Sequence, residues 1–322
     1  MSVTHPVKGK TAIITGAGSG INLAFATLLL ENDCNVVIAD LGLRPEAQAV
    51  VNKFNGHSGS ARAIFQKTDV TDWTQLEELF AVTEREFTEI DIVCPGAGVY
   101  EEHWSNFWRP PGSPESRDDP RGGRYRLVDI NLTHPIRVTQ LAISHFLQHR
   151  KSNSSRKHIV HISSIAGQSP STAAPIYVAT KHAISGLVRS LAKLDEKFGI
   201  RVTAVAPGLI KTPLWMEHPE KLKMFKEGQD VWVTAEEVGE VMLALVQQEE
   251  VSEIIGDKGR QGTLFPVKGG TVLEVSKTVR EVHPFNDPGP SNRAGNTIAN
   301  VEAVENEIYD LLSTDGWGKS RL

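Results

Sequence analysis

The chain has 322 residues, of which 40% are hydrophobic and 23% charged, and its formal net charge is −5. This composition predicts a globular protein of one large domain or two small ones, and the acidic balance argues against nucleic acid as a partner. No run of about 18 apolar residues predicts a membrane span, and we expect no signal peptide. Two lone cysteines, Cys34 and Cys94, fit a reducing compartment, so a cytoplasmic location is expected.

The first predicted elements are a strand at 10–15, a glycine-rich turn, and a helix that ends near Leu30. Backbone N–H groups at such a helix N-terminus, together with the helix dipole, bind a pyrophosphate. An ordinary turn is the alternative. The residues predicted to contact a dinucleotide here are Gly16, Gly18, Ser19, Gly20 and Ile21.

The second predicted strand, 35–39, ends in Asp40, twenty residues after Gly20. A carboxylate at this point suits the 2′-hydroxyl of an adenosine ribose and repels a 2′-phosphate. Ser19 leaves the loop without the basic residue that a 2′-phosphate requires, although Arg44 lies nearby. The sequence therefore favours NAD over NADP.

Later segments carry helix caps and strand signals. Asp72 with Gln75 predicts a helix to about Phe87, and Thr234 with Glu237 predicts another through about Gln248. Residues 264–267, before two glycines, are interpreted as the last strand. Alternating strand and helix signals through about residue 272 predict one doubly wound parallel sheet of the α/β class.

Tyr177 and Lys181 are four positions apart, so on a helix they share one face. A phenol with an ordinary pKa near ~10 is a poor base at neutral pH, and a neighbouring cation lowers that pKa. The pair therefore predicts an acid/base catalyst and the charge that tunes it. Alone, this spacing also occurs by chance in many helices.

Together these motifs resemble the classical short-chain dehydrogenase/reductase family over roughly residues 8–272. Thr15, Gly16 and Gly20 match the motif Thr-Gly-x-x-x-Gly-x-Gly, with Asn22 in place of the last glycine. Pro95-Gly96-Ala97-Gly98 stands where the family has Asn-Asn-Ala-Gly. The resemblance implies a Rossmann-type fold, with a single domain at 1–275 and a C-terminal helical extension at 276–322.

The resemblance also implies further cofactor contacts. Asp69 and Val70 correspond to the pair beside the adenine ring, and Ala97-Gly98 permits a close backbone approach. The segment that begins with Pro207-Gly208 corresponds to the loop that holds the nicotinamide carboxamide. Its predicted contacts are Pro207, Gly208, Ile210 and Thr212. Tyr177 and Lys181 are also expected to contact the cofactor, with Lys181 on the nicotinamide ribose hydroxyls.

The family's catalytic tetrad is carried over onto Asn131, Ser164, Tyr177 and Lys181, all of which this sequence retains. Ser164 follows the predicted strand 157–162 at its carboxyl end, where ligands bind in open α/β sheets. Pro135 lies four residues after Asn131 in a predicted helix, 127–147. Because proline has no N–H, the Asn131 carbonyl loses its helix partner and can bind a water instead. In the family this water links the lysine to solvent; a simple helix bend is the alternative.

No metal is expected, because the eleven histidines include no His-Glu-x-x-His and two cysteines cannot form a zinc site. An insertion at 100–125 contains Trp104, Phe107 and Trp108, which predict either a wall of an apolar substrate pocket or a staple to the core or a partner subunit. The resemblance implies a substrate lid at 209–230, in which Trp215 and Met224-Phe225 favour a bulky lipophilic substrate.

The extension ends in an apolar stripe that predicts an amphipathic helix. Its members are Ile298, Val301, Val304, Ile308, Leu311 and Leu312. The resemblance implies association through the helices that carry Asn131 and Tyr177, as a homodimer or homotetramer.

The leading functional prediction is an NAD-dependent oxidoreductase that interconverts a lipophilic secondary alcohol and its ketone by hydride transfer, with Tyr177 as general acid/base. A hydroxyprostaglandin- or hydroxysteroid-dehydrogenase-like activity and a role in fungal specialised metabolism are both open. The alternatives are a non-redox enzyme on the same fold, such as a dehydratase or cyclase, and an NAD-binding sensor.

Overall fold

A computed structural model describes residues 5–55, 61–150, 155–217, 222, 226–254, 262–284, 306–307, 309–310 and 312–314. The strands of the described residues are β1 (Thr11–Thr15), β2 (Asn35–Asp40), β3 (Ala63–Lys67), β4 (Ile92–Cys94), β5 (Lys157–Ile162), β6 (Ile200–Pro207), β7 (Glu250–Ser252), β8 (Leu264–Pro266), β9 (Val272–Val275) and β10 (Val279–Glu281). Their helices are α1 (Gly20–Glu31), α2 (Pro45–Lys53), α3 (Trp73–Phe87), α4 (Arg126–Val128), η2 (Asp129–Thr133), α5 (His134–Gln148), η3 (Ile165–Gly167), α6 (Pro175–Ser190), α7 (Leu194–Phe198), α8 (Pro213–Met216) and α10 (Ala235–Gln247).

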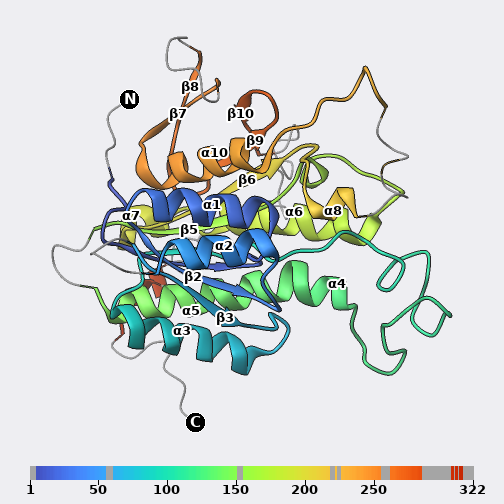
Figure 1. Cartoon of the computed structure of the whole chain (residues 1–322), viewed down its shortest axis with the longest axis horizontal. Helices are drawn as coiled ribbons and strands as arrows, with labels where there is room; N and C mark the ends of the chain where they lie inside the picture. The colour runs from blue at the N-terminus through green and yellow to red at the C-terminus, as the bar shows by residue number, and fades with distance from the viewer. Residues whose placement is uncertain are drawn as a thin grey trace, which may run out of the picture.

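Eight strands form the central sheet in the order β10-β9-β6-β5-β4-β1-β2-β3 (Figure 1). Every neighbouring pair is parallel except β9 and β10. The chain begins in the middle with β1, runs outward to β3, and returns to β4 on the other side of β1. This reversal makes a switch point between β1 and β4, where open α/β sheets bind ligands. The predicted doubly wound sheet is therefore confirmed.

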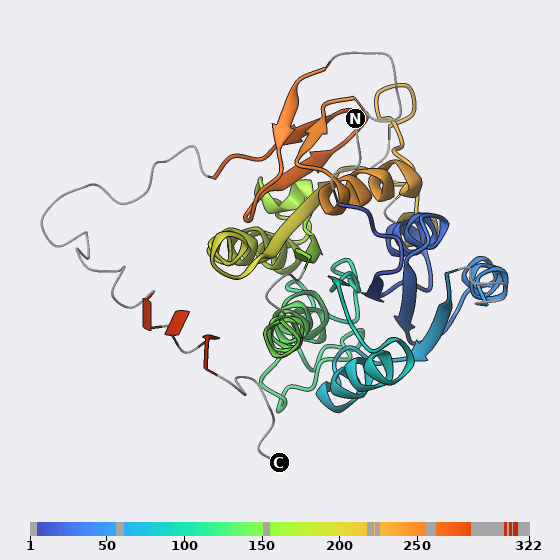
Figure 2. The ribbon, with the colours of Figure 1, turned by 90° about the vertical axis from the view of Figure 1, so that its left-hand side faces the viewer.

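Helices cover both faces of the sheet (Figure 2). Alternate strand residues face opposite layers, so Ile14 and Val36 pack with α1 and α10, whereas Ile13 and Val37 pack with α3, α5 and α6. These four side chains are fully buried. Strands that are apolar on both faces match the continuous hydrophobic runs in the sequence. None of the helices in the described part of the chain is long and apolar enough to cross a membrane.

Both predicted helix caps are present. The Asp72 carboxylate accepts the N–H groups of Thr74 and Gln75 at the start of α3. Thr234 and Glu237 form a reciprocal capping box at the start of α10. These local bonds satisfy N–H groups that the first helical turn leaves without partners.

The interpretation of residues 264–267 as the last strand of the main sheet is wrong. That segment contains β8, which pairs with β7 in a separate two-stranded antiparallel sheet. Leu264 is 48% exposed, whereas Val272 and Leu273 of β9 are buried beside β6. The more apolar strand β9, which follows Gly269 and Gly270, therefore occupies the position beside β6 in the main sheet. The sheet also continues past residue 275, because β10 pairs with β9.

The expected disturbance before Pro135 takes the form of a π-helical stretch. The short helix α4 passes into η2, which contains Asn131, and α5 then begins with Pro135 at its second position. Proline cannot donate the bond that a regular helix requires there, and π-helical turns often occur at functional sites. The backbone geometry is therefore irregular at Asn131, as the sequence predicted.

Little of the C-terminal stripe lies within the described residues. Ile298, Val301, Val304, Ile308 and Leu311 lie outside them. Leu312 and Tyr309 pack against the sheet face that α3, α5 and α6 cover. The Tyr309 ring lies 6.2 Å from that of Phe198. Tyr309 and Leu312 therefore contact the same core as the sheet.

Candidate active site

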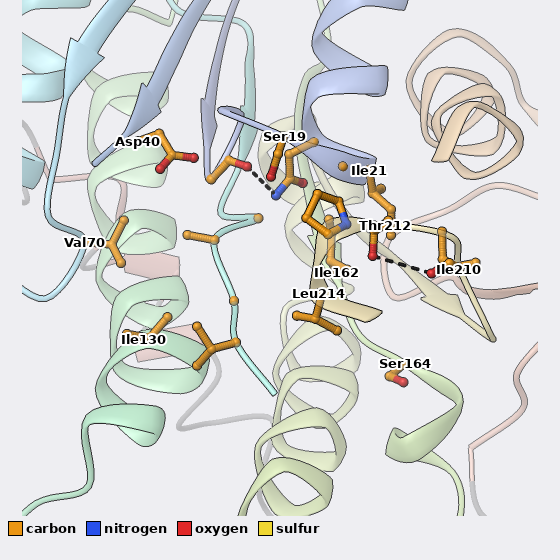
Figure 3. A pocket seen from close by; sticks show the side chains of 18 of the residues that line it. Ser19, Ile21, Asp40, Val70, Ile130, Ile162, Ser164, Ile210, Thr212 and Leu214 are labelled. Atoms are coloured by element: carbon orange, nitrogen blue, oxygen red, sulfur yellow. Dashed lines mark hydrogen bonds between the residues drawn. The ribbon is translucent and has the colours of Figure 1, made fainter. Parts of the chain in front are cut away.

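A cavity of about 440 Å³ lies at the carboxyl ends of the central strands. Asp40 and Val70 line it on one side and Ser164 lies toward its other end (Figure 3). The predicted residues that line it are Gly16, Ser19, Gly20, Ile21, Asp40, Asp69, Val70, Ala97, Gly98, Ser164, Tyr177, Lys181, Pro207, Gly208, Ile210, Thr212 and Trp215. Gly18 and Asn131 lie outside this lining, as do Trp104 and Trp108.

The glycine loop (residues 16–21) leads into α1 and presents the uncapped N-terminus of this helix to the cavity. Ser19 is the N-cap of α1 but makes no side-chain cap bond, and the first turn contains no acidic residue. Gly16 has a φ of +71°, and a Cβ there would lie 2.6 Å from Ala97 Cα. Only glycine fits this close approach. Free N–H groups beside the cavity fit the pyrophosphate of a dinucleotide.

Asp40 is held at the edge of the cavity by two backbone N–H groups. Its Oδ2 accepts from Gly18 N at 2.8 Å, and its Oδ1 accepts from Leu41 N at 2.7 Å. A Cβ on Gly18 would lie 2.8 Å from Asp40 Oδ2. Gly18 does not line the cavity itself, but its lack of a side chain leaves space for the Asp40 carboxylate. The fixed carboxylate fits a ribose diol at this end of the cavity.

Three polar side chains meet at the other end. Tyr177 and Lys181 project from α6, and Ser164, which follows β5, lies close enough to the Tyr177 hydroxyl to affect its pKa. Lys181 Nζ lies 5.5 Å from the centroid of the Tyr177 ring and donates to the Ile162 carbonyl at 2.9 Å. Ser163 instead points away, to Ser185 Oγ at 2.8 Å. The structure thus brings together the serine, tyrosine and lysine that the sequence selected.

The two pKa values differ from the expectation for a phenol tuned by its lysine. Burial raises the pKa of Tyr177 to about 12, although the Ser164 hydrogen bond opposes this shift. Burial lowers the pKa of Lys181 to about 8. The ammonium is bonded to Ile162, and the desolvation of the phenol dominates. In the protein alone, therefore, Tyr177 is protonated at neutral pH.

Asn131 ties η2 to the segment that follows β4. Its Oδ1 accepts from Val99 N at 2.9 Å, and its Nδ2 donates to Val99 O at 2.8 Å. A Cβ on Gly98 would lie 3.4 Å from Asn131 Oδ1 and 3.9 Å from Lys181 Nζ. The asparagine amide is thus fully engaged with the backbone and brings Gly98 close to the lysine.

The insertion caps the two helical segments that carry Asn131, Tyr177 and Lys181, a role that the sequence did not reveal. Buried Glu101 accepts the N–H of Phe107 at 2.8 Å and that of Tyr177 at 2.9 Å. Ser105 Oγ accepts from Leu127 N, and Asp118 Oδ1 accepts from Arg126 N, at the start of α4. These acceptors are far from the helices in sequence, so no local spacing signals them. Residues 100–125 therefore position both Asn131 and Tyr177.

We expect Glu101→Ala to lower the free energy of unfolding by about 2 kcal/mol, because two backbone N–H groups lose a charged acceptor. Glu101→Gln is also expected to destabilise, since its NH₂ group faces one of these donors. Denaturant unfolding monitored by circular dichroism measures the change. Glu240→Gln, which changes an exposed carboxylate on α10, serves as the matched control. Equal stability of the Glu101 and Glu240 variants would disprove the capping role.

A second unpredicted connection runs through His134. Its Nδ1 lies 3.0 Å from Ile130 O, a position for donation, so its Nε2 accepts from the Thr15 hydroxyl at 3.0 Å. Thr15 Oγ1 in turn accepts from Ala97 N at 3.2 Å. Burial lowers the pKa of His134 to about 4, which keeps the ring neutral. This chain of bonds joins η2, β1 and the Ala97 segment.

The tryptophans occupy different surroundings. Trp215 lines the cavity and meets Trp232 edge to face, with centroids 5.9 Å apart. Trp108 is 57% exposed, and its Nε1 donates to Thr172 O at 2.8 Å. Trp104 O accepts from Arg117 N within the insertion. Met224 and Phe225 of the predicted lid lie outside the described residues.

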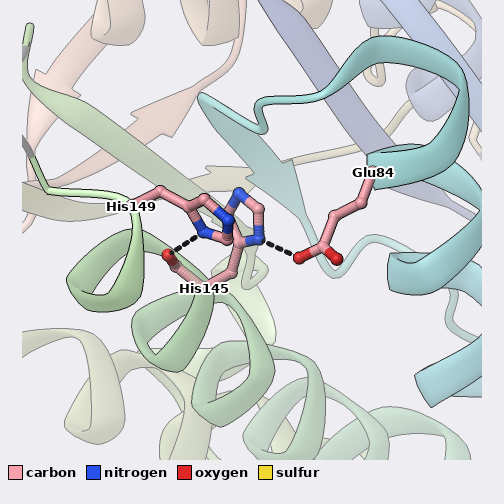
Figure 4. Close-up of side chains that lie close together, drawn as sticks. All are labelled: Glu84, His145 and His149. Carbon is pink, nitrogen blue, oxygen red and sulfur yellow. Dashed lines mark hydrogen bonds and ion pairs between the residues drawn. The ribbon is translucent and has the colours of Figure 1, made fainter. Parts of the chain in front are cut away.

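Among the described residues, Glu84, His145 and His149 have potential metal-ligand atoms within 4.8 Å of one another (Figure 4). His145 Nε2 accepts from Ile90 N at 3.2 Å, so its Nδ1 carries the proton and donates to Glu84 at 2.6 Å. His149 Nδ1 donates to the His145 carbonyl at 2.9 Å. Since both nitrogens of His145 have partners, these bonds link α3 to α5 structurally.

Comparisons with known proteins agree with this geometry. Residues 10–223 match the family model for short chain dehydrogenases. L-fucose dehydrogenase of Bos taurus is 31% identical over 224 residues, covering 68% of this chain and 74% of that protein. 15-hydroxyprostaglandin dehydrogenase (NAD(+)) of Rattus norvegicus is 31% identical over 221 residues, covering 67% and 73%.

A crystal structure of 3-ketoacyl-(acyl-carrier-protein) reductase from Brucella melitensis, complexed with NADH, has a TM-score of 0.61 at 21% identity. The match covers 75% of the present chain and 92% of the reductase chain. At this identity it supports the fold alone. The family model spans most of the chain, and the two dehydrogenases match it over similar lengths. This protein therefore belongs to the short-chain dehydrogenase family of oxidoreductases.

Proposed function

We propose that this chain is an NAD-dependent oxidoreductase that interconverts a lipophilic secondary alcohol and its ketone by hydride transfer. The observation that carries the proposal is one cavity with Asp40 and the uncapped α1 N-terminus on one side and the Tyr177–Ser164–Lys181 group on the other. This arrangement fits a dinucleotide whose reactive end meets an acid/base pair.

The proposed chemistry assigns one task to each side chain. A bound nicotinamide supplies the hydride acceptor or donor. Ser164 Oγ orients the substrate oxygen beside the Tyr177 hydroxyl. In oxidation the Tyr177 phenolate takes the alcohol proton as the carbinol hydride leaves; in reduction the neutral phenol returns that proton. Lys181 would hold the hydroxyl groups of the nicotinamide ribose, and its charge would favour the phenolate.

Burial raises the pKa of Tyr177 to about 12, so oxidation requires the positive charges of Lys181 and the oxidised cofactor to lower it again. In alcohol oxidation the active form is the phenolate. The value of kcat/KM should therefore rise with pH until the pH reaches the lowered pKa of Tyr177. In ketone reduction the active form is the phenol, which is already present at neutral pH.

Apolar side chains support a lipophilic substrate. Val99, Ile130, Leu214 and Trp215 line the cavity, and Ile130 and Leu214 both appear in Figure 3. Such walls exclude water and suit an apolar ligand that a few polar groups orient. The similarity to 15-hydroxyprostaglandin dehydrogenase favours a lipophilic secondary alcohol. The similarity to L-fucose dehydrogenase makes sugars the first alternative class to test.

Besides Asp40, an ion pair beside the cavity supports the preference for NAD. Arg44, beside Asp40, forms a bidentate ion pair with Glu217, in which Nη2 lies 2.7 Å from Oε2. Glu217 follows α8, in the lid region, and Arg44 lines the cavity. The carboxylate of Glu217 therefore occupies the cation that a 2′-phosphate would need.

We expect Glu217→Gln to raise kcat/KM with NADP relative to NAD by ~5-fold, the size of one exposed ion pair. The freed Arg44 can then bind a 2′-phosphate. The ratio is measured by initial rates with both cofactors. The double variant Arg44→Gln/Glu217→Gln should lose the gain. A ratio that stays at the wild-type value in Glu217→Gln would show that Glu217 has no part in cofactor choice.

The proposal includes a cytoplasmic homodimer or homotetramer. Both cysteines are free and buried, which fits a reducing compartment. Association is expected through α5 and α6, and Ile136 on α5 is 38% exposed. Sedimentation of the full chain measures the oligomeric state, and a monomer at all concentrations would contradict this part.

The function is tested by a screen of secondary alcohols with NAD and of ketones with NADH. The absorbance of the reduced nicotinamide is followed together with product formation. Hydride-coupled turnover of an apolar secondary alcohol or ketone supports the proposal. Product formed without any change in nicotinamide absorbance would indicate a non-redox enzyme. Tight NADH binding with no turnover of any compound would indicate a sensor.

A further inference from the structure

Two segments meet around a single side-chain amide beside the cofactor cavity. We call them the glycine loop (residues 16–21) and the strand-exit segment (residues 95–98). Asn22, on the first turn of α1, is 8% exposed and stands between them. Its Nδ2 donates to Gly16 O in the glycine loop at 3.2 Å. Its side chain also lines the cavity.

The other side of the same amide fills the space beside Gly96. A Cβ on Gly96 would lie 2.3 Å from Asn22 Oδ1, 2.7 Å from its Cγ and 2.8 Å from its Nδ2. Cys94 Sγ, at the end of β4, lies 4.0 Å from Asn22 Oδ1. No side chain fits at position 96 while the amide of Asn22 is present. The strand-exit segment therefore approaches α1 only because residue 96 is a glycine.

The two segments also touch each other directly. A Cβ on Gly16 would lie 2.6 Å from Ala97 Cα and 3.0 Å from Asn22 Nδ2. Ala97 N donates to the hydroxyl of Thr15, which precedes the glycine loop. The contact between the loops thus has room for one carboxamide, and this chain supplies it from α1 and not from the strand-exit segment.

We propose that Asn22 is a positioning residue that joins the glycine loop to the strand-exit segment, and that Asn22 and Gly96 form one coupled unit in which a single amide serves both segments. The sequence departures from the family motif at positions 22 and 96 are then two halves of one exchange. The ligand in the proposal rests on the proposed function, because the two segments line the site for a dinucleotide. The coupling itself depends only on packing.

The experiment is a double-mutant cycle with Asn22→Gly, Gly96→Asn and the double variant, read by the Kd for NADH from fluorescence titration. Asn22→Gly is expected to raise Kd about tenfold, as for the loss of one buried hydrogen bond. Gly96→Asn should bind worst, because two amides compete for one space. The double variant should return to within about threefold of the wild type, since the amide is restored from the other side.

Controls separate positioning from helix stability and from turnover. Asn22→Ala removes the amide without adding a glycine to α1, so it should raise Kd like Asn22→Gly. At saturating NAD, kcat of Asn22→Gly should change less than about threefold, whereas KM for NAD rises. The same cycle in thermal unfolding without cofactor tests the coupling even if NADH proves not to be the ligand.

A double variant that binds NADH no better than Gly96→Asn, or fails to fold, overturns the coupling. An unchanged Kd in both Asn22→Gly and Asn22→Ala overturns the positioning role. If Gly96→Asn does not fold and the double variant does, the coupling is supported. A wild type without affinity for NADH would refute the proposed function, and the unfolding cycle would still decide the coupling.

Discussion

Tyr177→Phe is expected to lower kcat for alcohol oxidation by ~10³-fold, the usual contribution of general acid/base catalysis. Phenylalanine keeps the ring that meets Tyr100 with centroids 5.0 Å apart, so the fold of α6 should persist. The variant loses the hydroxyl that Ser164 contacts and with it the proton carrier. Steady-state rates of the variant and the wild type measure the loss.

The control for Tyr177→Phe is cofactor binding. The Kd for NADH should stay within about twofold of the wild type, since a lost proton transfer affects the transition state and not the bound ground state. The rise of kcat/KM with pH should also vanish in this variant. Turnover close to that of the wild type, with normal NADH binding, would exclude Tyr177 as the acid/base.

Lys181→Met is expected to lower kcat/KM for alcohol oxidation by ~10²-fold and to raise KM for NAD. Methionine retains the length of the side chain but removes the charge that favours the phenolate. Activity should recover in part as pH rises, because a higher pH deprotonates Tyr177 even without the charge of the lysine. A pH–rate profile over both variants separates the roles: Lys181→Met shifts the profile and Tyr177→Phe abolishes it.

Lys181→Met, which is expected to lower activity, should not lower the stability of the fold. Burial lowers the pKa of Lys181 to about 8 from 10.5, so the unfolded chain binds more protons than the folded protein between these values. The contribution of this lysine to stability therefore rises with pH across that window and is unfavourable below it. Lys181→Met should match or exceed the wild-type unfolding temperature at neutral pH. Lys8→Met, at an exposed lysine, is the control. A strongly destabilised Lys181→Met would mean that its kinetic defect reports misfolding.

Local signals in the sequence predicted much of this site. The glycine loop, Asp40 and the Tyr177–Lys181 pair each depend on neighbours within a few residues or on one helix face. Asp40, Tyr177, Lys181 and most of the glycine loop line the cavity. Pro135 predicted the irregular backbone at Asn131 because a missing N–H acts within one helical turn. Such features are determined by residue type and spacing alone.

Contacts between distant segments could not be predicted in this way. Glu101 caps α6 at Tyr177, and Arg44 pairs with Glu217, through residues 76 and 173 positions apart. Likewise, β8 and β9 are both short and differ in which strand they pair with. A lowered Tyr177 pKa was expected from Lys181 alone, but desolvation is the largest cause and raises this pKa instead. Burial and pairing are properties of the whole fold.

The central claim is that a hydride passes between a secondary alcohol and NAD while Tyr177 carries the proton. It is tested most directly with an alcohol substrate from the screen that carries deuterium on its carbinol carbon. We expect mass spectrometry to find the deuterium on NADH, with one ketone formed per NADH, and we expect Tyr177→Phe to slow both together. Product that forms while the nicotinamide gains no deuterium would contradict it.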